Sequence, residues 1–217
     1  MKTDAFKTVV IGFGILLFAV VALWLYSRHS EIRAGVIERK KAETATYIRD
    51  RAAALVDTEV FAGGDSIRQR RVFQSFFDAI QSPELVRIKV WDRNLTVLWS
   101  NFGELIGQRF PENHEMQEAL AGEVEFEIEK QKPEHFSERQ FYELSETYVP
   151  ISDAKGQIVG VVEVYQPTLP LHEEIRSQFH KAALPVGVFM FVGYGALVIL
   201  LRLLMAPKKI GVGENPI

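Results

Sequence analysis

The hydrophobic and polar positions of this chain follow three different patterns. Residues 8–26 and 182–201 are predominantly apolar stretches without a charged residue, and each is long enough to cross the hydrocarbon core of a bilayer. Between them, apolar residues recur first every three or four positions, as in amphipathic helices, and then every second position, as in strands. The pattern predicts two membrane helices that flank an α+β domain.

Two helices are expected at the start of the central domain. Residues 27–60 contain no proline, and their apolar side chains lie mostly three or four positions apart, which predicts one long helix that continues from the membrane. A second helix is predicted over residues 67–81, with Pro83 as its stop. Its apolar residues share one face: Val72, Phe73, Phe76, Phe77 and Ile80.

The apolar period then changes to two, and five strands are predicted. They cover residues 84–92, 95–100, 123–130, 140–151 and 157–166. The turn between the last two strands, at residues 153–156, places Gly156 where a positive φ is easiest. Residues 101–122 are less regular, and Pro111 is expected to open a short helix there that Gly122 ends.

The last strand leads almost directly into the second membrane helix. Pro167 ends the strand because it has no backbone N–H to donate. Thr168 is then expected to cap a helix over residues 168–181. The hairpin at residues 147–166 is therefore the predicted output arm of the domain.

Charge and cysteine content narrow the class of protein. Residues 28–181 hold 20 Lys and Arg against 26 Asp and Glu, a net charge of −6, which argues against nucleic acid as a partner. The chain has no cysteine, so packing alone must hold the domain together, without disulfides.

The flanking charges predict the topology. Lysines precede the first apolar stretch, and Arg202, Lys208 and Lys209 follow the second, which favours two cytoplasmic termini. A cleaved signal peptide is the alternative interpretation of the first stretch, but its apolar run is longer than a usual signal. We expect a two-pass protein of the bacterial inner membrane with a periplasmic or extracellular domain. Its parts are a cytoplasmic N-terminus (1–7), a membrane helix (8–27), the extracytoplasmic domain (28–181), a second membrane helix (182–204) and a cytoplasmic tail (205–217).

Several short motifs fall in this order of elements. They are VRIKVWD at 86–92, LIGQRF at 105–110, ALAG at 119–122, YVPI at 148–151 and VGVVEVY at 159–165. Their order and spacing resemble the single Cache domains, the extracytoplasmic PAS-like sensor domains of bacterial histidine kinases, chemoreceptors and diguanylate cyclases. The resemblance covers roughly residues 30–181. It implies a PAS-like fold, with a long N-terminal helix packed on a five-stranded antiparallel sheet.

The resemblance also implies a function. A sensor (signal-input) domain of a two-component or chemosensory system binds a small ligand and passes a conformational signal through the second membrane helix. Such families normally carry a signalling module after that helix, whereas only residues 205–217 follow here. The output module is therefore expected to be separate or missing: the chain is either a stand-alone membrane protein or the input half of a split or truncated receptor. We expect a separate histidine kinase or other signalling protein as a possible partner, a homodimer, and no enzymatic activity. The alternative is a non-catalytic accessory protein that uses a degenerate Cache domain for protein–protein contact.

The resemblance places a ligand between one face of the sheet and the segment before the third strand. The candidate ligand-binding residues are Arg87, Lys89, Trp91, Arg109, Tyr142, Tyr148 and Tyr165. Two cations spaced by two would suit a small organic anion or an amino acid, and the rings would supply apolar contact. In the alternative interpretation, Arg87 and Lys89 are the solvated face of an edge strand.

An acidic segment offers a second kind of site. Twelve Glu and four Lys or Arg lie between Glu104 and Glu146, and carboxylates at alternate strand positions could hold Ca²⁺ or Mg²⁺. Metal ligands usually converge from several elements, so a solvated strand face is favoured and neither a metal nor a cofactor is predicted. No HExxH motif and no Gly-rich phosphate loop occurs, and no catalytic residue is predicted.

Overall fold

The computed structural model describes residues 2–63, 66–130 and 143–205. The chain falls into two compact units, one of Ala34–Glu174 and one formed by Met1–Arg33 with Ile175–Ile217. The elements follow in the order α1 (Lys2–Leu55), the 3-10 helix η1 (Thr58–Ala62), α2 (Ser66–Ile80), β1 (Arg87–Asp92), β2 (Val97–Ser100), the 3-10 helix η2 (Gly103–Leu105), α3 (His114–Ala121), β3 (Glu125–Lys130), β4 (Glu143–Ser152), β5 (Ile158–Pro167) and α4 (Leu169–Met205).

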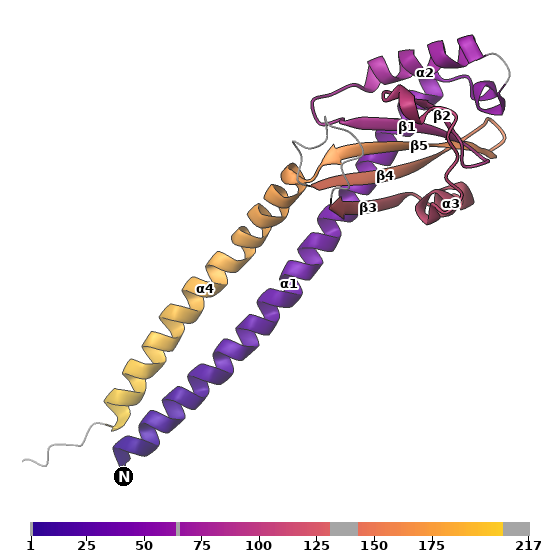
Figure 1. Cartoon of the computed structure of the whole chain (residues 1–217). Coiled ribbons are helices and arrows are strands. Elements are labelled where there is room, and N and C mark those ends of the chain that lie inside the picture. The colour runs from indigo at the N-terminus through magenta and orange to yellow at the C-terminus, as the bar shows by residue number, and fades with distance from the viewer. Residues whose placement is uncertain (1, 64–65, 131–142, 206–217) are drawn as a thin grey trace, which may run out of the picture. The chain divides into compact units, whose positions relative to one another are not determined.

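The central unit is built on one antiparallel sheet. Its strand order is β2-β1-β5-β4-β3, and Figure 1 shows the strands side by side. The predicted α+β class, the five strands and the long helix against the sheet are therefore confirmed. The position of β1 contradicts one expectation. It lies between β2 and β5, and Arg87 and Lys89 are only 2% and 7% exposed, so their interpretation as the solvated face of an edge strand is wrong.

One face of the sheet carries the main hydrophobic core. Side chains of α1, η1 and α2 pack there against alternate residues of β1, β4 and β5, as the strand period requires. Phe73 and Phe76 of α2 are almost fully buried in this core, and burying such a ring contributes ~1.5–3 kcal/mol. The predicted apolar faces of the long helix and of α2 thus have their partner in the same domain.

The opposite face is covered by residues 101–122, here called the excursion. Met116 and Ala119 of α3 pack on Trp91, Tyr148 and Val161 from three strands. Helix α3 begins at His114 and not near Pro111, because Asn113 caps it with a side-chain oxygen that accepts from the Met116 amide at 2.7 Å. Gly122 ends it in a left-handed conformation (φ 112°), as expected.

Two further boundaries differ from the sequence prediction. Helix α1 ends at Leu55, before the predicted residue 60, and η1 follows because the Asp57 side chain accepts from the Glu59 amide. Thr168 was expected to cap the last helix through its side chain. Its hydroxyl instead donates to the Glu143 carbonyl of β4 at 3.2 Å, while its carbonyl accepts from His172 in the first turn of α4.

The unit formed by the chain ends contains the apolar parts of α1 and α4. Both helices are long and apolar enough to cross a membrane. Within this unit the Tyr194 hydroxyl donates to the Val10 carbonyl at 3.0 Å, and Gly14 lies against the same hydroxyl. A small residue at this point lets the two helices approach closely.

Candidate ligand-binding site

A cavity of about 580 Å³ lies between the second face of the sheet and the excursion. We call it the sheet cavity. Its volume is within the ~300–1,000 Å³ range of small-molecule sites. It is lined by Lys89, Trp91, Arg109, Phe110, Pro111, Glu112, Asn113, Glu115, Glu127, Glu146, Tyr148 and Tyr165.

The floor of the sheet cavity is a network of buried polar groups around Glu163. The Trp91 indole N–H donates to Glu163 Oε2 at 2.6 Å, and the Tyr165 hydroxyl donates to Glu163 Oε1. Lys89 Nζ donates to the Tyr165 oxygen at 2.6 Å and lies 3.4 Å from Glu163 Oε1. All four side chains lie on one face because they alternate along two strands whose register places Lys89 opposite Glu163.

Glu163 needs all of these partners because it is fully buried, at 0% exposure. An isolated buried carboxylate is strongly destabilising, whereas one that is paired and hydrogen-bonded is tolerated. The network also fixes the positions of the donors and rings that line the cavity. Lys89 Nζ lies 4.8 Å from the ring centre of Tyr165 and 5.7 Å from that of Trp91, so the ammonium is held by ring faces as well as by oxygen.

A second polar group forms one wall of the sheet cavity. The Tyr148 hydroxyl donates to Glu146 Oε2 at 2.9 Å and accepts from the Asn113 side-chain amide at 3.4 Å. Glu146 is itself only 8% exposed, and the register of β3 and β4 places Glu127 directly opposite it. Two glutamates thus stand next to each other across the strands.

The pKa values of Tyr148 and Tyr165 are shifted by the environment of the cavity. Burial raises the pKa of both hydroxyls well above the ordinary value, because the charged phenolate loses its hydration. The negative charges of Glu163 and Glu146 raise the pKa of Tyr148 and of Tyr165 further. Both hydroxyls therefore stay protonated and remain donors over the physiological pH range.

The structure brings most of the predicted site residues together. Lys89, Trp91, Arg109, Tyr148 and Tyr165 all line the sheet cavity. Arg109 reaches it from the excursion, where its Nε donates to the Asn94 carbonyl at 2.9 Å.

Two predicted site residues do not belong to the described lining. Arg87 is buried on the same face, but its guanidinium stacks on Tyr165, 4.6 Å from the ring centre, and on Phe102, and it does not line the cavity. Tyr142 lies outside the described residues.

The sequence prediction missed the acidic members of the site. Glu163 stands alone among apolar residues in VGVVEVY, which is the signal that could have identified it as a buried functional charge. Glu127 was assigned to a solvated strand face, but it is half-buried and lines the cavity. Among the residues that the structure describes, no group of three carboxylates or histidines has the geometry of a metal site.

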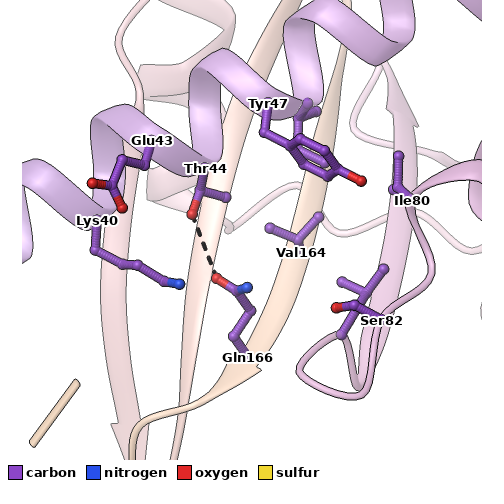
Figure 2. Close-up of a pocket in the computed structure, with 10 residues that line it drawn as sticks. Lys40, Glu43, Thr44, Tyr47, Ile80, Ser82, Val164 and Gln166 are labelled. Carbon is purple, nitrogen blue, oxygen red and sulfur yellow. Dashed lines mark hydrogen bonds between the residues drawn. The ribbon is translucent and has the colours of Figure 1, made fainter. Parts of the chain in front are cut away.

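Two other cavities have fewer features of a ligand-binding site. One of about 200 Å³ lies between α1, the end of α2 and β5, and Figure 2 shows Thr44 hydrogen-bonded to Gln166 across it at 3.5 Å. Its volume is below the usual range for ligand sites, and it marks the contact between the long helix and the last strand. Another, of about 570 Å³, lies beside the turn at residues 92–94 and is lined by η1 residues and the turn. Among their described lining residues, neither has a buried ion pair comparable to Lys89 and Glu163.

Comparison with solved structures finds similar chains at low sequence identity. The structure is similar to that of the sensor domain of DcuS from E. coli, with 18% identity and a TM-score of 0.40 over 67% of this chain and 98% of that one. It is also similar to the sensor domain of the V. cholerae histidine kinase DctB, with 17% identity and a TM-score of 0.48 over 76% of this chain and 60% of that one.

A third similar structure is a sensory box sensor histidine kinase from Vibrio cholerae, with 18% identity and a TM-score of 0.32 over 46% of this chain and 92% of that one. No protein-family model matches the sequence, and no curated protein matches it.

Proposed function

We propose that this chain is a membrane-anchored signal-input protein whose extracytoplasmic domain binds a small ligand in the sheet cavity. The observation that carries the proposal is the cavity itself, which has a ligand-sized volume and a floor of charged and aromatic side chains fixed by a buried network. Preorganised polar groups beside apolar walls are typical of small-molecule sites. The proposal is of a binding protein that has no catalytic role.

The route from the sheet cavity to the membrane follows the chain. Tyr165 lines the cavity near the end of β5, and α4 begins four residues later at Leu169. The first turn of α4 is also bonded to β4, because His172 Nε2 lies 2.6 Å from Glu143 Oε2. A ligand that shifts β5 would therefore shift the first turn of α4 and bias a two-state equilibrium of the membrane helices. The signal then passes to an output module.

The accessory-protein alternative predicts that the face with Arg87 and Lys89 is exposed or filled. The cavity next to Lys89 and Tyr148 favours ligand binding over this alternative. We further propose that both termini face the cytoplasm, from the flanking lysines and arginines, and that the chain forms a homodimer.

The proposal is tested by ligand-dependent thermal stability of the full-length protein in lipid nanodiscs. We expect at least one member of a library of carboxylates, amino acids, amines and divalent cations to raise the Tm. Phe110→Ala should weaken this effect, because Phe110 lines the cavity and packs edge-on against Trp91. Ile106→Ala, an exposed position of the same excursion outside the lining, is the matched control. A library without any stabilising compound, or equal effects in the two variants, would contradict the proposal.

A further inference from the structure

Basic side chains gather where the two apolar stretches meet the central domain. We call residues 28–33 of α1 and 175–181 of α4 the basic band. With histidines neutral, its four Lys or Arg against one Glu give a net charge of +3, whereas residues 34–174 hold 16 Lys and Arg against 25 Asp and Glu, a net charge of −9. The wider segments 28–41 and 169–181 together hold seven Lys or Arg against four Glu, also +3, so the sign does not depend on the chosen bounds. The cations of the band are Arg28, Arg33, Arg176 and Lys181.

The two halves of the basic band belong to one surface. Both lie in the compact unit formed by the chain ends, and the rings of His29 on α1 and Phe179 on α4 pack edge to face with their centres 5.2 Å apart. Just before the band, Trp24 and Tyr26 are exposed at the end of the first apolar stretch. Aromatic rings at such a position are typical of the boundary between hydrocarbon and headgroups.

The spacing of the four cations matches the depth of the headgroup layer. Arg28 and Lys181 lie next to the apolar stretches, and Arg33 and Arg176 lie five residues further from them. Five residues of helix span about 7.5 Å. The polar layer on each side of the hydrocarbon core is roughly 5–8 Å thick, so all four cations fall at the level of the lipid phosphates.

The side chains of the basic band are available to lipid. All four cations are exposed, and Arg28 pairs with Glu31 at 3.0 Å. Within the part of the chain that the structure describes, Arg33, Arg176 and Lys181 form no ion pair. Guanidinium and ammonium groups donate strong charge-assisted hydrogen bonds to phosphate oxygens. A zwitterionic headgroup offsets its phosphate with its own cation, whereas an anionic headgroup leaves the negative charge for the protein.

We infer that the basic band binds anionic phospholipid headgroups on the side of the membrane that carries the domain. This surface selects lipids of one charge at the point where α1 and α4 leave the bilayer. The inference goes beyond the proposed function, because none of the band residues lines the sheet cavity.

The test uses Trp24 as a reporter of the neighbouring lipid. Trp24 is exposed four residues before Arg28, about 6 Å along α1, whereas Trp91 and Trp99 are buried in the domain. The full-length protein is placed in phosphatidylcholine vesicles that contain increasing fractions of brominated phosphatidylglycerol or of brominated phosphatidylcholine, and quenching of tryptophan fluorescence is measured. Brominated phosphatidylglycerol should reach half-maximal quenching at about one-fifth of the mole fraction, the equivalent of ~1 kcal/mol for one cation near an anionic surface. At ~1 M NaCl most of this preference should disappear, because exposed charges are then screened within ~3 Å.

Two sets of substitutions separate charge from fold. Arg33→Gln, Arg176→Gln and Lys181→Gln combined should reduce the preference for phosphatidylglycerol about fivefold or more, since three cations are lost. Arg33→Lys combined with Arg176→Lys retains both charges and should retain the preference. A loss in the first variant that the second does not share cannot come from a disturbed helix.

The matched control removes the same charge elsewhere. Arg70→Gln, Arg71→Gln and Arg93→Gln change three exposed positions in α2 and in the turn after β1, and the combined variant should keep the lipid preference. Equal quenching of the unmodified protein by the two brominated lipids overturns the inference. A preference that survives in the band variant, is lost equally in the control, or persists at ~1 M NaCl also overturns it. These results leave the proposed sensor function intact, because that function is tested by the ligand-dependent Tm.

Discussion

At the scale of single residues, the buried pair of Lys89 and Glu163 is the centre of the network below the sheet cavity. The two residues are 74 positions apart in the sequence. Both side chains are buried, so water cannot solvate either charge in place of its partner. Such a pair is weak evidence of net stabilisation, but removal of one member leaves an uncompensated charge in the interior.

Lys89→Met should therefore destabilise the domain by about 3–5 kcal/mol, because Glu163 stays buried without its cation. The measurement is urea unfolding of the full-length protein, followed by tryptophan fluorescence. Lys155→Met, in the exposed turn between β4 and β5, is the control and should change stability little. Adding Glu163→Gln to Lys89→Met should recover part of the loss, since the unpaired charge is then gone. Equal stability of the two single variants would show that the network is not a structural unit.

The buried tyrosines predict a loss of stability at alkaline pH. The pKa of Tyr148 and of Tyr165 is raised in the folded state above the ordinary value of 10.0. Below about pH 10 both states keep the proton and stability is unaffected. Above it the unfolded state loses the proton first and is favoured, so stability falls by about 1.4 kcal/mol per pH unit for each tyrosine until the folded-state pKa is reached.

This prediction is checked by unfolding at a series of pH values from 8 upward. Tyr148→Phe and Tyr165→Phe should each reduce the slope above about pH 10. Tyr47→Phe, which changes a tyrosine that is exposed in the folded protein, is the comparison. A slope that none of the variants alters would mean that these hydroxyls do not control the alkaline transition.

At the scale of elements, the packing of η1 on the sheet depends on one glycine. A Cβ on Gly160 of β5 would lie 2.3 Å from both the Phe61 ring of η1 and the Trp91 carbonyl of β1. Because the Trp91 carbonyl belongs to a strand backbone, it cannot move aside as a flexible side chain can.

Gly160→Ala should consequently destabilise the domain by about 1–3 kcal/mol, the usual cost of overpacking a core. Gly103→Ala places its Cβ in open space and serves as the control. Both can be compared by thermal unfolding of the full-length protein. A Gly160→Ala variant as stable as the control would contradict the close approach of η1 and β1.

Local sequence patterns predicted the elements well but not their neighbours. The period of two in residues 86–91 matches the structure, in which Ile88 and Val90 lie in the main core and Lys89 and Trp91 lie on the opposite face. It could not reveal that β1 is flanked by β2 and β5, because strand order is set by long-range pairing. For the same reason the sequence did not predict the glutamates of the site, since Glu127 and Glu146 become neighbours only through the register of β3 and β4.

Helix ends were predicted less well, because competing caps decided them. Pro111 is a suitable first residue for a helix, yet Asn113 offers a side-chain acceptor three residues before Met116 and determines the start of α3. Thr168 has the right chemistry for a cap, but its hydroxyl is used by β4. In both cases the tertiary or local hydrogen bond outweighed the simple positional preference.

At the scale of the whole molecule, the sheet cavity and the membrane helix are linked by the chain itself. Tyr165 lies in the cavity floor, and only Gln166, Pro167 and Thr168 separate it from α4. Arg39 of α1 forms an ion pair with Glu174 of α4 within the same compact unit, so the first turns of α4 are bonded to β4 and to α1. A ligand that alters β5 should therefore be felt in residues 166–174.

Hydrogen exchange of the full-length protein in nanodiscs tests this claim most directly. Exchange of the backbone amides is compared with and without the compound that gives the largest rise in Tm. We expect slower exchange at the cavity, in β1, β4 and β5, and also a ligand-dependent change in residues 166–174, while α2 on the far face of the sheet changes little. Protection confined to the cavity, with no change at the start of α4, would contradict the proposal that this domain signals through the membrane helix.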